Sequence, residues 1–297
     1  MKEEFEFIFS LLVSGMSIGM MYSLIALGFV LVYKATDAIN FAQGEFVMLA
    51  GYFVTVALAA SLPIWAAAIL GIIGMIVFSF TLERTVLRPL LGRPVVAVIM
   101  ATIGLASILR GLPPIPIGAQ TKVLPLPIPD TPISLGWATI APIQLLGVAV
   151  SAACLGAFTW FFMKSRMGVA MRAVADNQQV AMAMGINVER YFAIAWAMAG
   201  IVSALGGIIW GSMLGVDTQL ALVGLKVFPV VILGGLDSII GAVIGGLIVG
   251  VVESLAAGYL DPVVGGGTKD FAPYVLMIIM LMFKPYGMFG KRKIERI

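Results

Sequence analysis

The sequence contains no histidine and has a single cysteine among its 297 residues. Without histidine there are no imidazole metal ligands, no histidine-based catalytic triads and no histidine proton relays. The one cysteine, Cys154, cannot form an intramolecular disulfide, and its apolar surroundings indicate simple packing of a small side chain. Charge is also scarce: 11% of the residues are charged, whereas soluble domains carry about 25%.

Motifs that would indicate an enzyme are missing as well. No GxxxxGK[ST] phosphate-binding loop occurs, no segment pairs carboxylates for acid–base chemistry, and no Cys/His spacing fits a metal site. We therefore expect no catalytic residues, no metal and no cofactor bound by this chain. The net charge of +3 does not indicate nucleic acid, because the basic residues sort by membrane side as described below.

What the sequence has in abundance is apolar surface. Hydrophobic residues make up 61% of the chain, and the mean hydropathy is +1.09. No water-soluble core could bury this much, so the surrounding solvent must be the lipid bilayer. We expect an all-α, polytopic membrane protein with a single membrane domain over residues 1–297.

Nine segments are candidates for membrane-spanning helices, each of which needs about 20 mainly apolar residues. Segment 220–235 is short and flanked by glycine, so it is re-entrant or broken, and we expect about eight to nine transmembrane helices. The candidates are 7–33, 38–60, 64–82, 95–112, 140–163, 192–215, 220–235, 238–258 and 271–289.

The distribution of lysine and arginine predicts the orientation, since cytoplasmic loops are enriched in both. With the N-terminus outside, most of the 18 basic residues fall on the cytoplasmic side, in 83–94, 164–191 and 284–297. Segment 113–139, rich in proline, then lies outside, and Arg110 is counted with that outer side.

Glycines at helical spacing predict close contacts between helices. Residues 234–255 read GGLDSIIGAVIGGLIVGVVESL, and a second ladder precedes them. In lipid, such small residues let backbones approach, and Gly-Gly breaks are typical of the interrupted helices of transporters. The packing glycines are Gly207, Gly211 and Gly215 in one segment, and Gly241, Gly245, Gly246 and Gly250 in the other.

A polar stretch, NFAQGE, begins the segment 38–60. Asn40, Gln43 and Glu45 line a translocation path if they lie at membrane depth, where polar groups face protein or water. The alternative is a helix start near the cytoplasmic interface, with Asn40 as cap and Glu45 favoured by the helix dipole. A further acid, Glu253, is expected to reach interfacial water.

The loop 164–191 is too polar to span the membrane. Asp176 with Gln179 resembles a capping pair, a short helix is expected at roughly 177–184, and Gly185 takes the position of a C′ glycine. Its apolar members, Val180, Met182 and Met184, predict burial against a neighbour. That neighbour is either the protein's own helices or a soluble partner.

Several stretches together resemble the LivH-type permeases of bacterial branched-chain amino acid ABC importers. They are NFAQGEFVMLAGYF, LLGRPVVAVIMATIGLASILRG, GVAMRAVADNQQVAMAMGINVERY, FPVVILGGLDSIIGAVIGGLIVGVVESL and MFKPYGMFGKR. The match runs nearly end to end and in order. The family motif commonly reads NFAHGE, so Gln43 stands where histidine is usual, and glutamine keeps hydrogen bonding but does not titrate near neutral pH.

The resemblance implies an inner-membrane permease with the ABC importer permease fold. Its implied partners are a second related permease or a second copy of itself, two cytoplasmic ATPases that use ATP and Mg, and a periplasmic binding protein. The loop from Asp176 to Asn187 corresponds to the segment that docks on the ATPase. Relatives serve branched-chain amino acids, urea, short amides or carboxylates.

Two functions from other classes remain as alternatives. An ion-coupled secondary transporter would need mid-membrane charges, and the sequence places its few charges near the predicted helix ends. A membrane scaffold or enzyme subunit would not need glycine-broken helices. The reading favoured by the residues and the resemblance is an importer permease for branched-chain or hydrophobic amino acids.

Overall fold

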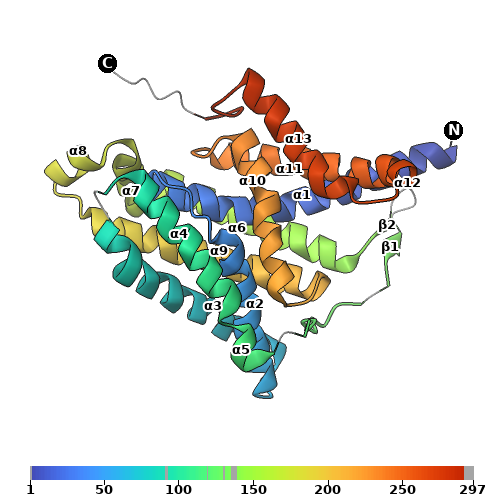
Figure 1. Ribbon diagram of the computed structural model, residues 1–297, viewed down its shortest axis with the longest axis horizontal. Coiled ribbons are helices and arrows are strands. Elements are labelled where there is room, and N and C mark those ends of the chain that lie inside the picture. Colours follow the sequence, from blue (N-terminus) through green and yellow to red (C-terminus); the bar gives the residue numbers. More distant parts are fainter. Residues whose placement is uncertain (1, 91–92, 119, 130, 135–138, 291–297) are drawn as a thin grey trace. The chain divides into compact units, whose positions relative to one another are not determined.

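The computed structural model describes residues 2–90, 93–118, 120–129, 131–134 and 139–290, and they are overwhelmingly helical (Figure 1). Four of the basic residues predicted to be cytoplasmic lie outside the described residues: Lys291, Arg292, Lys293 and Arg296. The α-helices are α1 Lys2–Thr36, α2 Gln43–Ala59, α3 Ile64–Leu82, α4 Val95–Gly111, α5 Pro114–Ile117, α6 Pro142–Lys164, α7 Arg166–Asp176, α8 Gln178–Ala183, α9 Val188–Met213, α10 Leu222–Gly234, α11 Ile239–Leu255, α12 Asp261–Val264 and α13 Thr268–Phe283.

Shorter elements extend or join these helices. π-Helical turns continue α3 over Glu83–Leu87 and α11 over Ala256–Leu260, and 3₁₀ turns form Arg88–Leu90 and Thr218–Ala221. Strands β1 Ile133–Ser134 and β2 Thr139–Ile140 pair antiparallel, with Ile133 opposite Ile140. The proline-rich segment between α4 and α6 is otherwise largely irregular, as its composition predicts.

Six helices of the described chain are long and apolar enough to cross a membrane, which supports the predicted class of helical, polytopic membrane protein. They correspond to six of the nine candidate segments. Segments 38–60 and 220–235 form shorter apolar helices, Gln43–Ala59 and Thr218–Gly234, and α13 has 16 residues, so the expected eight to nine spans are not confirmed. The six spans are Glu4–Thr36, Ile64–Leu90, Val95–Ile117, Pro142–Lys164, Val188–Met213 and Ile239–Val264.

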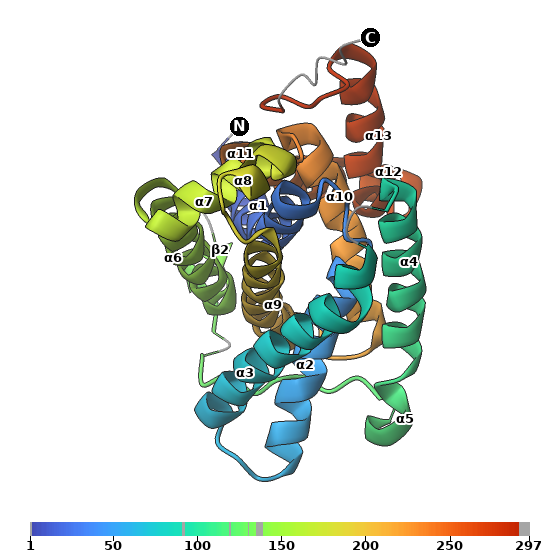
Figure 2. The same cartoon turned by 90° about the vertical axis from the view of Figure 1, so that its left-hand side faces the viewer.

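The chain forms two compact units, and each is described by itself. The first unit comprises residues 1–26, 127–153 and 226–297, and the second comprises 27–126 and 154–225. In the second unit, α2, α3 and α9 pack on one another (Figure 2). Their core is built around Phe46, whose ring lies 5.5 Å from that of Phe78 and 5.9 Å from that of Trp196. This packing fixes the start of α2 against two long spans, near the middle of Ile64–Leu90 and in the first half of Val188–Met213.

In the first unit, the glycines of α11 contact two different helices. A side chain at Gly245 would collide with the Val230 carbonyl of α10, and Gly241 lies against Gly234 at the end of that helix. On another face of α11, Gly246 and Gly250 lie against the α1 backbone at Gly19 and Gly15, and a Cβ added at Gly250 would lie only 2.6 Å from the Gly19 Cα. The two GxxxG pairs thus give α11 two faces of close approach, one for each neighbour.

The ladder of Gly207, Gly211 and Gly215 is only partly a packing surface. Gly207 meets the α2 backbone at Val47 and Gly51. Gly211 instead contacts side chains of Val216 and Leu124. Gly215 lies beyond Met213, where α9 ends, and has a φ of +85°. Its assignment to helix packing is therefore wrong: it turns the chain, in a conformation that glycine adopts at little cost.

In the first unit, the segment after α13 and a helix cap stabilise the break between α10 and α11. The N–H groups of Met288 and Phe289 donate to the carbonyls of Leu233 and Gly234 at the end of α10. Ser238 caps α11 by accepting from the Gly241 N–H at 2.9 Å. These contacts satisfy backbone groups that the break between α10 and α11 exposes.

Candidate functional site

The polar stretch Asn40–Glu45 lies level with the middle of the neighbouring spans of the second unit. The Gln43 side chain donates to Ser203 Oγ at 2.9 Å, and Ser203 is near the middle of α9. The Phe41 N–H donates to Thr102 Oγ1 inside α4. Since α2 begins at Gln43 rather than at residue 38, the chain after α1 turns back to this level before α2 begins.

The predicted cap at this helix start is wrong. The N-cap of α2 is Ala42, and no side chain caps it. Asn40 instead accepts from the Ala42 N–H at 3.0 Å and donates to Gln43 Oε1 at 3.2 Å. The Asn40 and Gln43 side chains are both buried and hydrogen-bonded within this chain. Absence of a side chain at Gly28 leaves the space that the Gln43 amide fills.

Glu45 has a partner that the sequence analysis did not foresee. Its carboxylate accepts from Arg110 Nη2 at 2.5 Å, with the Glu45 side chain 3% exposed and that of Arg110 46% exposed. Sequence reasoning counted Arg110 with the outer side because it is near the end of a candidate span. The pair joins the first turn of α2 to α4 and neutralises a buried acid, which would otherwise be costly at this depth.

The loop 164–191 is a chain of capped helices. Ser165, Asn177 and Asn187 are the N-caps of α7, α8 and α9, and each accepts from the N–H three residues later. The predicted short helix is confirmed as α8, but the capping pair of Asp176 with Gln179 is wrong, because Asp176 ends α7 and Asn177 provides the cap. The amphipathic α7 was not predicted.

Gly185 ends α8 as predicted. It has a φ of +80°, its N–H donates to the Met182 carbonyl, and the Ile186 N–H donates to that of Ala181. This is the Schellman arrangement, which glycine favours. The apolar side chains before it point away from the rest of the chain: Val180 is 57% exposed, Met182 56% and Met184 77%. Burial against the protein's own helices is therefore wrong for these three.

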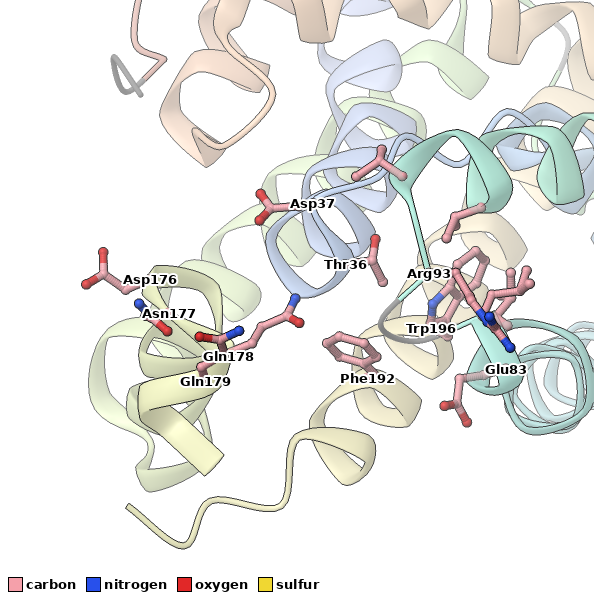
Figure 3. Close-up of a pocket in the computed structure, with 14 residues that line it drawn as sticks. Thr36, Asp37, Glu83, Arg93, Asp176, Asn177, Gln178, Gln179, Phe192 and Trp196 are labelled. Carbon is pink, nitrogen blue, oxygen red and sulfur yellow. The ribbon is translucent and has the colours of Figure 1, made fainter. Parts of the chain in front are cut away.

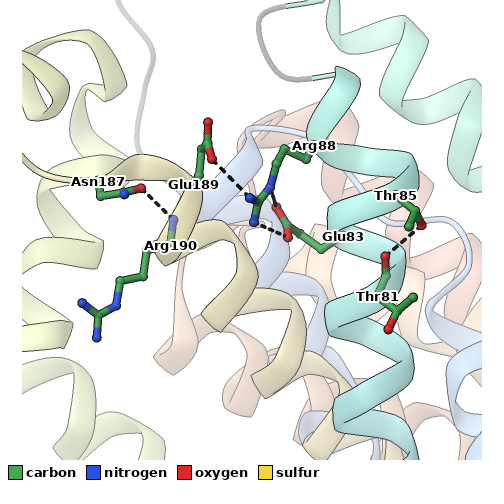
Figure 4. Close-up of polar contacts among 7 residues, drawn as sticks. All are labelled: Thr81, Glu83, Thr85, Arg88, Asn187, Glu189 and Arg190. Atoms are coloured by element: carbon green, nitrogen blue, oxygen red, sulfur yellow. Dashed lines mark hydrogen bonds and ion pairs between the residues drawn. The ribbon is translucent and has the colours of Figure 1, made fainter.

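Three contacts fix the loop to the second unit. Gln178 Nε2 donates to the Ala35 carbonyl at the end of α1. Arg172 donates to the Phe162 carbonyl of α6. At the other end, Arg88 bridges buried Glu83 and exposed Glu189 at 3.0 and 3.2 Å, close to where Asn187 caps α9 (Figure 4). These contacts fix the position of the loop that carries the exposed Val180, Met182 and Met184.

A cavity of about 420 Å³ lies beside α8, within the second unit. Figure 3 shows Asp176 to Gln179 on one side and Glu83, Arg93 and Trp196 on the other. Its floor is apolar, with Phe192 and Trp196 buried. Asn40, Gln43 and Glu45 do not line this cavity. The full lining is Thr36, Asp37, Glu83, Leu87, Leu90, Arg93, Val95, Val98, Asp176, Asn177, Gln178, Gln179, Phe192 and Trp196.

In the first unit, Glu253 does not reach interfacial water as expected. It is buried, accepts from Lys226 Nζ at 2.9 Å, and accepts from the Tyr22 hydroxyl at 2.7 Å. Lys226 also pairs with Asp270 at 2.8 Å. These side chains connect α1, α10, α11 and α13. The sequence signal that was available is the single lysine within an apolar segment, which needs an acid nearby.

Six apolar spans, glycine contacts between helices and a buried polar cluster at mid-span define a multi-pass membrane protein. Residues 11–283 match the family model described as branched-chain amino acid transport system / permease component, so the chain belongs to this family. The resemblance drawn from the sequence motifs is confirmed.

Relatives of similar length support the assignment. The chain is 30% identical to the high-affinity branched-chain amino acid transport system permease protein LivH of Salmonella typhimurium, over all of both chains. It is 31% identical to the corresponding protein BraD of Pseudomonas aeruginosa, over 96% of this chain and 97% of that one. A probable LivH of Methanocaldococcus jannaschii is 30% identical over 92% and 90%.

Proposed function

We propose that this chain is the permease subunit of an ATP-driven importer for branched-chain or other hydrophobic amino acids in the bacterial inner membrane. A periplasmic binding protein delivers the substrate, and the chain passes it to the cytoplasm. The similarity to LivH and BraD, which are permease proteins of branched-chain amino acid transport systems, supports the substrate class. Urea, a short amide or a small carboxylate in the same importer class is the alternative substrate.

The observation that carries this proposal is the exposure of Val180 and Met182 on α8 and of Met184 at its C-cap. Three apolar side chains in water are unfavourable unless a partner covers them. In the proposed assembly, a cytoplasmic ATPase covers them and contacts the loop from Asp176 to Asn187, with Gly185 setting the exit angle of the chain. ATP and Mg are bound by the two ATPase subunits, and this chain has no catalytic site.

The cavity beside α8 extends this docking surface. A partner side chain entering it would meet the caps of α8 on one side and α9 on the other. Arg88 joins Glu189, in the first turn of α9, to Glu83, directly after α3. A displacement of α8 would therefore be transmitted to both α9 and α3. We infer that this is how ATPase closure is transmitted to the spans.

The remaining parts of the assembly follow the family pattern. A second permease, either related or a second copy, pairs with this chain to enclose the path, near which Asn40, Gln43 and Glu45 lie. The chain forms a single transmembrane domain with 164–191 as its coupling loop and eight to nine helices when the short apolar helices Gln43–Ala59 and Thr218–Gly234 and helix α13 are included. The loops 83–94, 164–191 and 284–297 are cytoplasmic, and 113–139 is periplasmic.

Reconstitution tests the function. Vesicles holding the permeases, ATPases and binding protein should take up leucine only with ATP and binding protein present. Uptake driven by an ion gradient without ATPase would favour a secondary transporter instead. Lys122→Cys in a Cys154→Ala background should react with an impermeant thiol reagent from the periplasmic side, and reaction from the cytoplasmic side alone would contradict the orientation.

A further inference from the structure

Helix α4 presents a face that no described part of the second unit covers. At Gly104 and Gly111, no atom beyond the local helix backbone lies within 4 Å of where a side chain would begin. Met100, Ile103 and Ser107 lie exposed along the same stripe, spaced by three or four residues. Arg110 is at the end of this stripe, with nearly half of its side chain exposed.

Arg110 lies within the span Val95–Ile117 and is held there. Its partner Glu45 is in the first turn of α2, which ends at Ala59, so at about 1.5 Å per residue Glu45 lies roughly 20 Å from that end. The neighbouring Phe46 contacts Phe78, at the middle of the span Ile64–Leu90. Because the ion pair ties the guanidinium to this depth, Arg110 cannot extend freely to the membrane surface.

An exposed guanidinium at this depth is incompatible with contact to lipid chains. We propose that the face of α4 carrying Arg110 lines the aqueous substrate path, and that Arg110 binds the carboxylate of the amino acid passing through it. This inference rests on the proposed importer function. It adds a substrate-binding residue that the motif Asn40–Glu45 does not contain.

The chemistry of the pair suits such a site. A guanidinium carries five N–H donors, and among the described residues Glu45 accepts from one of its nitrogens, Nη2. The remaining donors can bind a carboxylate in the paired geometry that arginine favours. Glu45 and Arg110 are neutral together, so the empty path carries no net charge here, and a zwitterionic amino acid adds none. Because Glu45 compensates the charge of Arg110, the substrate is bound weakly enough to be released.

The matched control is on the same helix. Ile108 is 56% exposed, against 46% for the Arg110 side chain, and stands at the other edge of the uncovered face, about 160° from Arg110 across it. Cysteine is introduced at position 110 or 108 in a Glu45→Gln, Cys154→Ala background, which leaves no unpaired buried acid. The complete transporter is reconstituted in vesicles and treated with a membrane-impermeant anionic methanethiosulfonate reagent.

Cysteine at 110 should react at least about tenfold faster than cysteine at 108, because only a hydrated thiol ionises to the reactive thiolate. A reaction at 110 no faster than at 108 would overturn the placement on the path.

A second measurement separates binding from folding. Arg110→Gln combined with Glu45→Gln keeps a neutral hydrogen-bonding pair and should assemble with the ATPase, yet lose about tenfold or more in uptake, since a charge-assisted hydrogen bond is lost. Arg110→Lys should retain uptake better. Undiminished uptake by the doubly neutral variant would contradict the proposal. If the parent transports no leucine while cysteine 110 still reacts, the proposed substrate fails and the placement of α4 stands.

Discussion

The buried interior of the spans and the loop 164–191 differ in where their side chains find partners. In the interior, polar side chains and glycines lie in apolar segments and find their partners within this chain. Gln43 is hydrogen-bonded to Ser203, Glu45 is paired with Arg110, and Gly245 packs against α10. In the loop, apolar side chains of α8 lie where composition is polar, and the described chain leaves them exposed. These interior groups are paired within the described chain, whereas the apolar side chains of the loop are not covered by it.

This comparison can be tested by substitutions with graded effects on folding. The largest effect is expected from Gly245→Leu, since a side chain there must displace the backbone of Val230 and Gly234, which cannot yield. The variant should fail to fold or assemble. Gly156→Leu on α6, where nothing lies within 4 Å, is the control and should express normally. Detergent-resistant assembly measured by size-exclusion chromatography distinguishes them.

Gln43→Leu is expected to have the next largest effect. It keeps the bulk but leaves Asn40 and Ser203 without their buried partner, at a cost of about 1–3 kcal/mol. A thermal unfolding midpoint lowered by several degrees, together with reduced uptake, is the expected result. Gln43→His, which restores the residue usual in the family, should recover both. Unchanged stability and transport in Gln43→Leu would show that the hydrogen bonds of Gln43 contribute to neither.

Gly185→Val should cost about 1–2 kcal/mol locally, because a β-branched residue resists the left-handed conformation. The membrane spans are untouched, so the variant should insert and keep its global stability. Binding of the ATPase, measured by co-purification, should fall. Gly185→Asn is the control, since asparagine tolerates this conformation.

Met182→Asp should have the smallest effect on folding and a clear effect on assembly. The side chain is exposed, so the isolated permease should unfold at the parental temperature. A charge on the docking surface should nevertheless weaken ATPase binding, while Met182→Leu should not. Parental ATPase binding and uptake in both Met182→Asp and Gly185→Val would locate the coupling surface elsewhere.

Much of the local structure follows from short stretches of sequence. The end of α8 at Gly185 and the cap at Ser238 depend on one residue and its neighbours, so they could be predicted. The cap of α8 was missed by one residue, because Asp176 and Asn177 are both good caps and the extent of α7 decides between them. Gly215 was misplaced because glycine serves equally in a contact or a turn.

The sequence by itself determined the solvent, the helical class and the family, because apolar composition and ordered motifs need no three-dimensional context. Only the tertiary structure decided the partners of the charges. Arg110 and Glu45 are 65 positions apart, and Lys226 and Glu253 lie on different helices. No spacing rule relates such residues. Their pairing depends on the level at which α2 begins and on which faces of the glycine-bearing helices meet, and both are results of packing the whole chain.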